Sequence, residues 1–266
     1  MLNEKPPPNA NEEFWREFLL HGSESERRKR AIYKRLPSNP RCRLCAAPFG
    51  GIGAPLMRVI GKRPAENNPN LCNACFTFVT DNHGGAEIEL SLLFADIRGS
   101  TSLAETMSPG EFRAILDRFY DTAAKAVVDH DGFVDKFVGD ELVATFAPLL
   151  AGEQHAKRAV EAAQALMKAT GHDEPGGPWV PLGAGVHTGP AWMGAVGEGP
   201  HAAMTALGDA VNVAARLAAL AKPGEILVTT DAAMAAGLDA TLPTQQLDLK
   251  GKSQQTEVIS LRSGRS

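Results

Sequence analysis

Residues 92–101 read Leu-Leu-Phe-Ala-Asp-Ile-Arg-Gly-Ser-Thr, an apolar run followed by charged and small polar residues. Alternating residues from Glu87 onward lead into a continuous apolar run that ends at Ala95. Alternation followed by a solid apolar run predicts a strand that is buried in its later half. Because Asp96 comes next, the sequence predicts a carboxylate at the end of a buried strand.

Helical and extended patterns alternate after this strand. Residues 109–130 carry apolar side chains at i, i+3, i+4, i+7 and i+8, which predicts an amphipathic helix. Strands over 132–138 and 142–146 flank Gly139-Asp140, a dipeptide typical of a hairpin turn. The other expected elements are a helix over 152–170, strands over 182–188 and 191–196, a helix over 209–221, a strand over 225–230, a short helix over 231–236 and strands over 245–250 and 256–261. This order predicts an α+β fold with a ferredoxin-like β-α-β-β-α-β core.

The hairpin turn supplies a second carboxylate, Asp140. If the two strands are neighbours, Asp96 and Asp140 face one cleft. Two carboxylates and a backbone carbonyl suit Mg²⁺, a hard cation that usually also binds substrate phosphates. Asp is also common in turns, where it bonds to the local backbone, so the spacing alone leaves a purely structural role open.

Four motifs occur in one order along the chain. They are residues 92–101, Lys136-Phe137-Val138-Gly139-Asp140, residues 205–217 (Thr-Ala-Leu-Gly-Asp-Ala-Val-Asn-Val-Ala-Ala-Arg-Leu) and Leu249-Lys250-Gly251-Lys252. Together they resemble the catalytic domain of class III adenylate and guanylate cyclases, over about residues 88–262. Residues 183–189 also resemble the Gly-rich central strand of that family. The resemblance implies the ferredoxin-like fold of a cyclase catalytic domain.

The resemblance also implies a role for each matching position. Asp96 and Asp140, with the Ile97 carbonyl, would hold two Mg²⁺ or Mn²⁺ ions per active site. The remaining roles are purine recognition by Lys136 and Thr205, orientation of the ribose and stabilisation of the transition state by Asn212 and Arg216, and binding of the β- and γ-phosphates by Lys250. Taken singly, each residue also fits a structural role, such as a solvated turn for a lysine.

The implied reaction is attack of the ribose 3′-oxygen on the α-phosphorus of ATP, with pyrophosphate leaving. Adenine N1 is an acceptor that matches the Lys136 ammonium, whereas guanine N1 carries a hydrogen. The Thr205 hydroxyl can accept from the adenine amino group or donate to guanine O6, so we expect Lys136 to do most of the discrimination in favour of ATP. In the family, the metal-binding aspartates and the base-reading residues come from different protomers. Since this chain has one copy of each motif, we expect a homodimer with active sites at the interface.

Two departures from the family pattern keep an alternative open. Glu141 follows the second aspartate, where the family commonly has a small residue, and residues 201–204 lack the charged and aromatic residues often found there. The alternative is a catalytically weak or inactive cyclase homologue that acts as a nucleotide-binding signalling module.

All four cysteines lie outside the resemblance, in two pairs: Cys42 with Cys45, and Cys72 with Cys75. Two Cys-x-x-Cys turns can close a tetrahedron around zinc, and the second pair resembles the second knuckle of a treble-clef zinc finger. We expect one structural Zn²⁺ per chain. An iron–sulfur cluster or a redox dithiol are less favoured alternatives.

Charge is distributed unevenly along the chain. Residues 1–85 hold 13 Lys and Arg and 8 Asp and Glu, a net charge of +5, and residues 86–266 have a net charge of −9. We expect three units: an N-terminal tail and helices (1–37), a Cys₄ metal-binding module (38–85) and a cyclase catalytic domain (86–266).

A zinc-finger protein that binds nucleic acid is a further alternative, which we disfavour because the chain lacks aromatic stacking motifs. With neither a secretory signal nor a membrane helix in the sequence, we expect a cytoplasmic protein without membrane contact.

Overall fold

The computed structural model describes residues 8–22, 24–38, 40–251 and 254–262. Residues 1–7 of the expected tail and Lys252 of the last motif lie outside this range. The strands are β1 (Gly84–Ile97), β2 (Phe133–Val138), β3 (Glu141–Phe146), β4 (Leu182–Val196), β5 (Ala203–Leu207), β6 (Glu225–Thr229), β7 (Thr244–Leu247) and β8 (Thr256–Arg262). The helices are α1 (Pro8–His21), α2 (Glu24–Arg35), α3 (Gly53–Val59), α4 (Asn73–Asp81), α5 (Ser100–Thr106), α6 (Pro109–Asp129), α7 (Pro148–Ala151), α8 (His155–Ala169), α9 (Asp209–Leu220) and α10 (Thr230–Ala236), with 3-10 turns η1 (Gly152–Gln154) and η2 (Gly199–His201).

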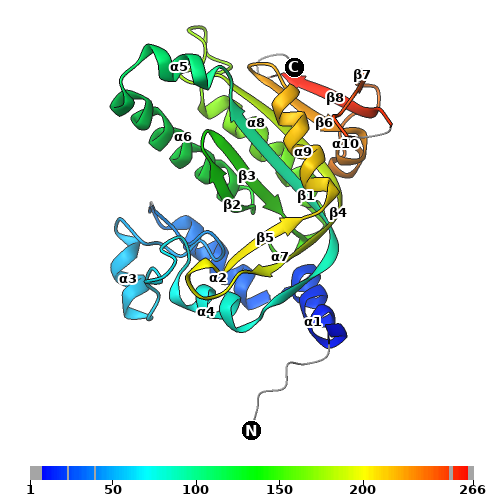
Figure 1. Ribbon diagram of the computed structural model, residues 1–266. Coiled ribbons are helices and arrows are strands. Elements are labelled where there is room, and N and C mark those ends of the chain that lie inside the picture. The colour runs from blue at the N-terminus through cyan, green and yellow to red at the C-terminus, as the bar shows by residue number, and fades with distance from the viewer. Residues whose placement is uncertain (1–7, 23, 39, 252–253, 263–266) are drawn as a thin grey trace.

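One sheet organises the described part of the chain, in the order β2-β3-β1-β4-β6-β8-β7, with β5 paired to β4 (Figure 1). The first four strands in this order, with α6 and α8, form the expected ferredoxin-like core, so the α+β prediction is confirmed. The long strands β1 and β4 pair antiparallel from Gly84↔Ala195 to Ile97↔Leu182. These two strands form the central pair of the sheet, and the candidate metal site lies at one end of it.

Both faces of the sheet are covered, which explains the continuous apolar run at the end of β1. Leu92 and Phe94 belong to a cluster on one face, with α1 and α9, while Leu93 and Ala95 belong to a cluster on the other, with α6, α8 and α10. Successive side chains of a strand point to opposite faces, so a strand covered on both sides must be apolar throughout.

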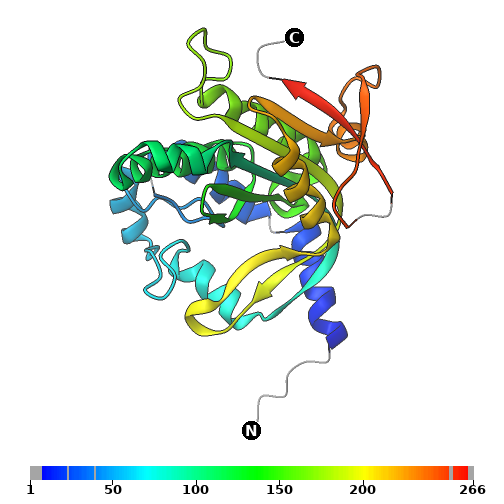
Figure 2. The same ribbon diagram turned by 45° about the horizontal axis from the view of Figure 1, so that its top comes forward.

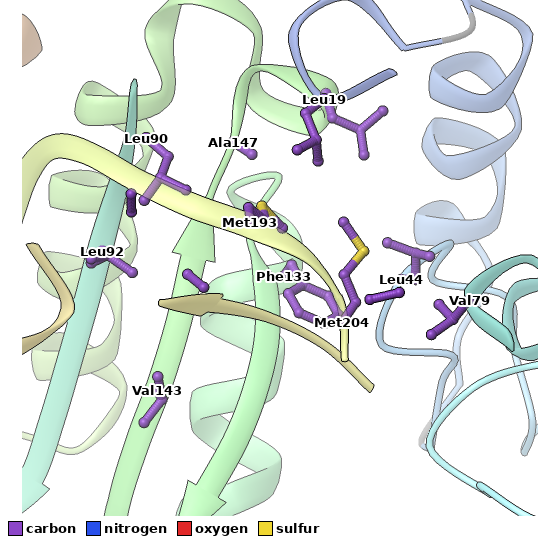
Figure 3. Close-up of a cluster of buried hydrophobic side chains, with 14 of the residues drawn as sticks. Leu19, Leu44, Val79, Leu90, Leu92, Phe133, Val143, Ala147, Met193 and Met204 are labelled. Carbon is purple, nitrogen blue, oxygen red and sulfur yellow. The ribbon is translucent and has the colours of Figure 1, made fainter. Parts of the chain in front are cut away.

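The N-terminal segments share the first of these clusters. Leu19 of α1, Leu44 beside the first cysteine pair and Val79 of α4 lie close to Phe133 and Met204 of the cyclase-like region (Figure 3). Both ribbon views place α2 beside β2 and α4 beside the hairpin of β4 and β5, with α3 farther from the sheet (Figures 1 and 2). The cysteine-containing segment is therefore packed against the sheet by shared apolar burial, which is the main driving force of such docking.

The strands differ from expectation at four places: β5 lies where no strand is expected, β7 ends three residues earlier than expected, and two further differences concern β1 and β4. β1 begins at Gly84, three residues before the alternation that starts at Glu87, and β4 runs through Gly189-Pro190, where two strands are expected. One edge of β4 pairs with β1 along almost its whole length. The other edge pairs with β6 only at 183–186 and with β5 only at 192–196. Pro190 lies in the gap between these pairings, where a residue without an N–H disturbs no ladder on that edge.

Candidate functional site

The two predicted metal-binding aspartates lie at the same end of the sheet. Asp96 is the second-last residue of β1 and is paired in register with Glu141 of β3, while Asp140 lies in the β2–β3 turn. The Ile97 amide donates to the Asp140 carbonyl, with N and O 3.4 Å apart. The fold thus brings together two aspartates that are 44 positions apart in the sequence, next to the Ile97 main chain.

Negative charge is concentrated at this end. Burial, followed by the neighbouring charge of Asp140, raises the pKa of Glu141. The positive charge of Arg98 opposes this rise in the pKa of Glu141. The Arg98 guanidinium also donates through Nη2 to Asp96 Oδ2 and through Nη1 to the Ala219 carbonyl, the latter at 2.8 Å. Carboxylate and carbonyl oxygens are the ligands that Mg²⁺ and Mn²⁺ prefer, so the donor set fits a divalent cation.

The two predicted base-reading residues meet although 69 positions separate them. Lys136 Nζ of β2 donates to Thr205 Oγ1 of β5 at 3.3 Å. Thr205 is buried, whereas the Lys136 side chain is half-exposed. β5 pairs with β4 rather than with β2, so the contact between Lys136 and Thr205 is made by side chains.

A third residue completes this group, and the sequence analysis missed it. The Thr205 hydroxyl donates to Asp135 Oδ2 at 2.5 Å, and Asp135 Oδ1 lies 3.5 Å from Lys136 Nζ. The β2–β3 register shifts between Val134 and Lys136, which marks a β-bulge at Asp135. Adjacent residues of a regular strand point to opposite faces, and a bulge is the feature that lets Asp135 and Lys136 approach the same hydroxyl.

The residues predicted to act on ribose and phosphates are carried by α9 and the loop after β7. Asn212 and Arg216 are one turn apart on α9, so they share a face; Asn212 is exposed and Arg216 half-buried. A Cβ added at Gly251 would lie 3.4 Å from Arg216 Nη2, which places the Lys250-Gly251 turn beside this guanidinium.

A glycine sets the position of α9. A Cβ on Gly185 of β4 would lie 2.5 Å from the Ala214 carbonyl oxygen and 2.6 Å from Leu217 Cβ. Gly185 therefore lets α9 pack directly on β4, and this close approach accounts for the Gly-rich strand singled out in the sequence.

Two cavities of the described chain lie away from these residues. One, of about 730 Å³, is lined by the middle of β4, the start of α9 and α10. The other, of about 670 Å³, lies between the cysteine-containing segment and α6. None of the seven predicted nucleotide-site and metal-site side chains of the cyclase-like region lines either of these two cavities.

The four cysteines converge. Their Sγ atoms all lie within 4.8 Å of one another, and among the described residues they are the one such group of three or more His, Cys, Asp or Glu side chains. Cys45 and Cys72 Sγ are 3.7 Å apart. Two ligands of a tetrahedral zinc, each about 2.3 Å from the metal, are about 3.8 Å apart, so the cluster fits zinc.

A lysine faces this sulfur cluster. Lys62 Nζ lies 3.6 Å from Cys45 Sγ and 3.9 Å from Cys72 Sγ. Burial lowers the pKa of Lys62, but the negative charge of Cys45, Cys72 and Cys75 outweighs burial and raises the pKa overall. The Lys62 ammonium would offset part of the negative charge that four thiolates carry.

A buried arginine ties the cysteine-containing segment to the sheet. Arg30 of α2 is 3% exposed, and its guanidinium donates to the Leu44 carbonyl and, at 2.6 Å, to the Gly132 carbonyl. Lys34 Nζ, one turn later, donates to Asp131 Oδ1 at 2.7 Å. α2 thus joins the loop of the first cysteine pair to the start of β2.

Two further contacts reach the strands of the predicted base-reading residues. Arg43 Nη1 donates to the Asp135 carbonyl at 3.2 Å, and its guanidinium lies 5.9 Å from the centre of the Phe137 ring. Asn68 Nδ2 donates to the Ala202 carbonyl at 3.4 Å, just before β5. The cysteine-containing segment therefore contacts both strands that carry the predicted base-reading residues.

No helix in the described part of the chain has the length and apolar character needed to cross a membrane.

Known proteins similar to this chain point to one family. The adenylate cyclase of Anabaena cylindrica is 35% identical over 142 residues, which are 50% of this chain and 27% of that protein. Adenylate cyclase 1 of Rhizobium meliloti (strain 1021) is 34% identical over 139 residues, 50% of this chain and 21% of that protein. The chain thus spans about a quarter of the length of these relatives.

Solved structures show the same fold. The guanylyl cyclase Cya2 superposes with a TM-score of 0.61 at 23% identity, covering 66% of this chain and 93% of that one. The adenylyl cyclase CyaB from P. aeruginosa superposes with a TM-score of 0.59 at 24% identity, covering 68% and 97%. The family model described as "Adenylate and Guanylate cyclase catalytic domain" matches residues 86–260, and the chain belongs to this family.

Proposed function

We propose that this chain is an adenylate cyclase that converts ATP into 3′,5′-cyclic AMP and pyrophosphate. The observation that carries the proposal is the contact between Lys136 and Thr205. An ammonium donor beside a hydroxyl complements adenine, which offers an acceptor at N1 and a donor at its 6-amino group. The two relatives named above, both called adenylate cyclases, support the same substrate.

Each residue has a task in this reaction. Lys136 and Thr205 bind the purine edge, Asn212 orients the ribose, and Lys250 binds the β- and γ-phosphates as a point charge. Arg216 meets the negative charge that develops on the α-phosphate oxygens in the transition state.

Asp96 and Asp140 would hold two divalent cations, with the Ile97 carbonyl as a further ligand. When bound, Mg²⁺ or Mn²⁺ lowers the pKa of the ribose 3′-hydroxyl and offsets charge on the phosphate oxygens. The pairing of Arg98 with Asp96 offsets part of the carboxylate charge in the chain alone. Glu141 adds a third carboxylate that can influence the preference between the two metals.

We propose a homodimer with two equivalent active sites at the interface. The aspartates would come from one protomer, and the base-reading and transition-state residues from its partner. The exposure of Asn212 and Lys250 and the half-exposure of Lys136 support this arrangement, since a partner protomer can reach these side chains.

We propose further that residues 38–85 form a structural zinc module with a regulatory role, preceded by residues 1–37 and followed by the catalytic domain over 86–266. The convergent cysteines support the zinc. The contacts of Arg43 and Asn68 with the base-reading strands support an influence on activity.

Purified protein incubated with ATP and Mn²⁺ tests the proposed activity. We expect cyclic AMP and pyrophosphate in equal amounts, measured by liquid chromatography with mass spectrometry. A protein that binds ATP without forming either product would instead be a nucleotide-binding homologue.

A further inference from the structure

We infer that Asp135 is a positioning residue for purine selection, which sets the Thr205 hydroxyl as a hydrogen-bond acceptor. The inference rests on the proposed use of Lys136 and Thr205 in base recognition. A threonine hydroxyl alone does not discriminate, because it can accept from the 6-amino group of adenine or donate to O6 of guanine. Asp135 removes this ambiguity.

The hydrogen bonds of the hydroxyl can be counted. It has one proton and two lone pairs. The proton goes to Asp135 Oδ2 at 2.5 Å rather than to the more distant Ala206 carbonyl at 3.5 Å, and one lone pair receives Lys136 Nζ at 3.3 Å. The second lone pair can accept from the adenine 6-amino group, whereas no proton is left for guanine O6.

The carboxylate is built into the fold. The Asp135 side chain is 5% exposed, and the bulge between Val134 and Lys136 turns it toward Thr205. Burial is the largest influence and raises the pKa of Asp135 overall, although hydrogen bonds from Thr205, the Ala206 amide and Lys136, together with the Lys136 charge, partly offset that rise. The geometry gives the donor: Thr205 Oγ1 donates to Asp135 Oδ2, and a carboxylate next to the Lys136 ammonium only accepts hydrogen bonds.

Substituting Asp135→Asn changes this arrangement with little change in shape. The amide can present its NH₂ group to Thr205, which frees the hydroxyl proton for guanine O6. The readout is the ratio of kcat/KM for ATP to kcat/KM for GTP, measured for wild type, Asp135→Asn, Thr205→Val and the double variant. A buried mismatched hydrogen bond predicts a fall in this ratio of about fivefold to tenfold for Asp135→Asn. The exposed Asp173→Asn should leave it unchanged.

The double variant separates positioning from a general structural role. If Asp135 acts through the hydroxyl, Asp135→Asn has no further effect on the ratio once Thr205→Val has removed that hydroxyl. Asp135→Ala is a second substitution with the same expected loss, should the asparagine variant fold poorly by its thermal midpoint. Competition of ATP and GTP against a fluorescent ribose-labelled nucleotide gives the same ratio from binding.

The outcomes are distinct. A wild type that prefers GTP in both turnover and binding overturns the proposed substrate and this inference together. A wild type that prefers ATP, with folded Asp135→Asn and Asp135→Ala proteins whose ratio stays within twofold of wild type, overturns only the role of Asp135. An equal further loss in the Thr205→Val background would also overturn it, since Asp135 would then act by another route.

Discussion

The guanidinium of Arg43 donates a hydrogen bond to the main-chain carbonyl of Asp135, across 92 positions of sequence. Arg43 stands between Cys42 and Cys45, and Asp135 forms the bulge next to Lys136. The loop that would hold a metal is therefore in direct contact with the strand that would read the purine.

This contact predicts that Arg43→Ala weakens the enzyme although Arg43 is neither a metal ligand nor a substrate contact. Without this hydrogen bond, the main chain at Asp135 is less firmly held next to Lys136. We therefore expect kcat/KM for ATP to fall by about threefold to tenfold. Zinc content should not change. The control is Arg58→Ala, an exposed arginine on α3 of the same segment. Equal activity of both variants and wild type would show that the contact does not influence the site.

The sulfur cluster predicts about one zinc per chain, measured by elemental analysis of purified protein. Cys42 and Cys72 are buried in the same cluster as Ile88 and Leu90 of β1. We therefore expect Cys72→Ser to lose the metal and to lower the thermal midpoint of the chain. Iron and sulfide in a brown protein would instead establish an iron–sulfur cluster, and a metal-free protein of full stability would rule out a structural metal.

Substitution of the two strand-end aspartates, Asp96 and Asp140, should abolish turnover and leave the fold intact. Asp96→Asn and Asp140→Asn should each lower kcat by at least about a hundredfold at saturating Mn²⁺, because each removes a charged ligand from the proposed ions. Glu153→Gln, an exposed change, is the matched control. Circular dichroism checks the fold, and near-normal kcat in either aspartate variant would remove that residue from the site.

Much of this organisation was readable in the sequence because local patterns specify it. The apolar run before Asp96, the hairpin at Gly139-Asp140 and the helical periodicity of α6 each follow from side-chain spacing, and all are present in the structure. The continuity of β4 through Pro190 was not readable, since it depends on which strands pair on each edge.

The role of Asp135 was hidden for a similar reason. Its side chain faces Thr205 only because of a bulge, and no local pattern marks that bulge in the sequence. Docking of the cysteine-containing segment depends on single long side chains, such as Arg30 and Arg43, that reach main-chain carbonyls far away in sequence. In the sequence these arginines look like ordinary solvated charges.

The proposed homodimer predicts complementation between inactive variants. Asp96→Ala and Arg216→Ala should each be inactive alone, while a mixture with exchanged subunits should regain activity. Random exchange makes half of the dimers mixed, each with one intact site, so recovery should approach about a quarter of wild-type activity. Absence of rescue in a mixture shown to exchange would place all these residues in one protomer.

We propose that this chain cyclises ATP because Lys136 and Thr205 select adenine. Purified protein incubated with equal, subsaturating ATP and GTP in one vessel, with both cyclic nucleotides quantified by mass spectrometry, measures this selection. A hydrogen-bond mismatch between guanine and the Lys136 ammonium, next to the buried Thr205, predicts at least about tenfold more cyclic AMP than cyclic GMP. Equal amounts of the two products, or an excess of cyclic GMP, would contradict the account.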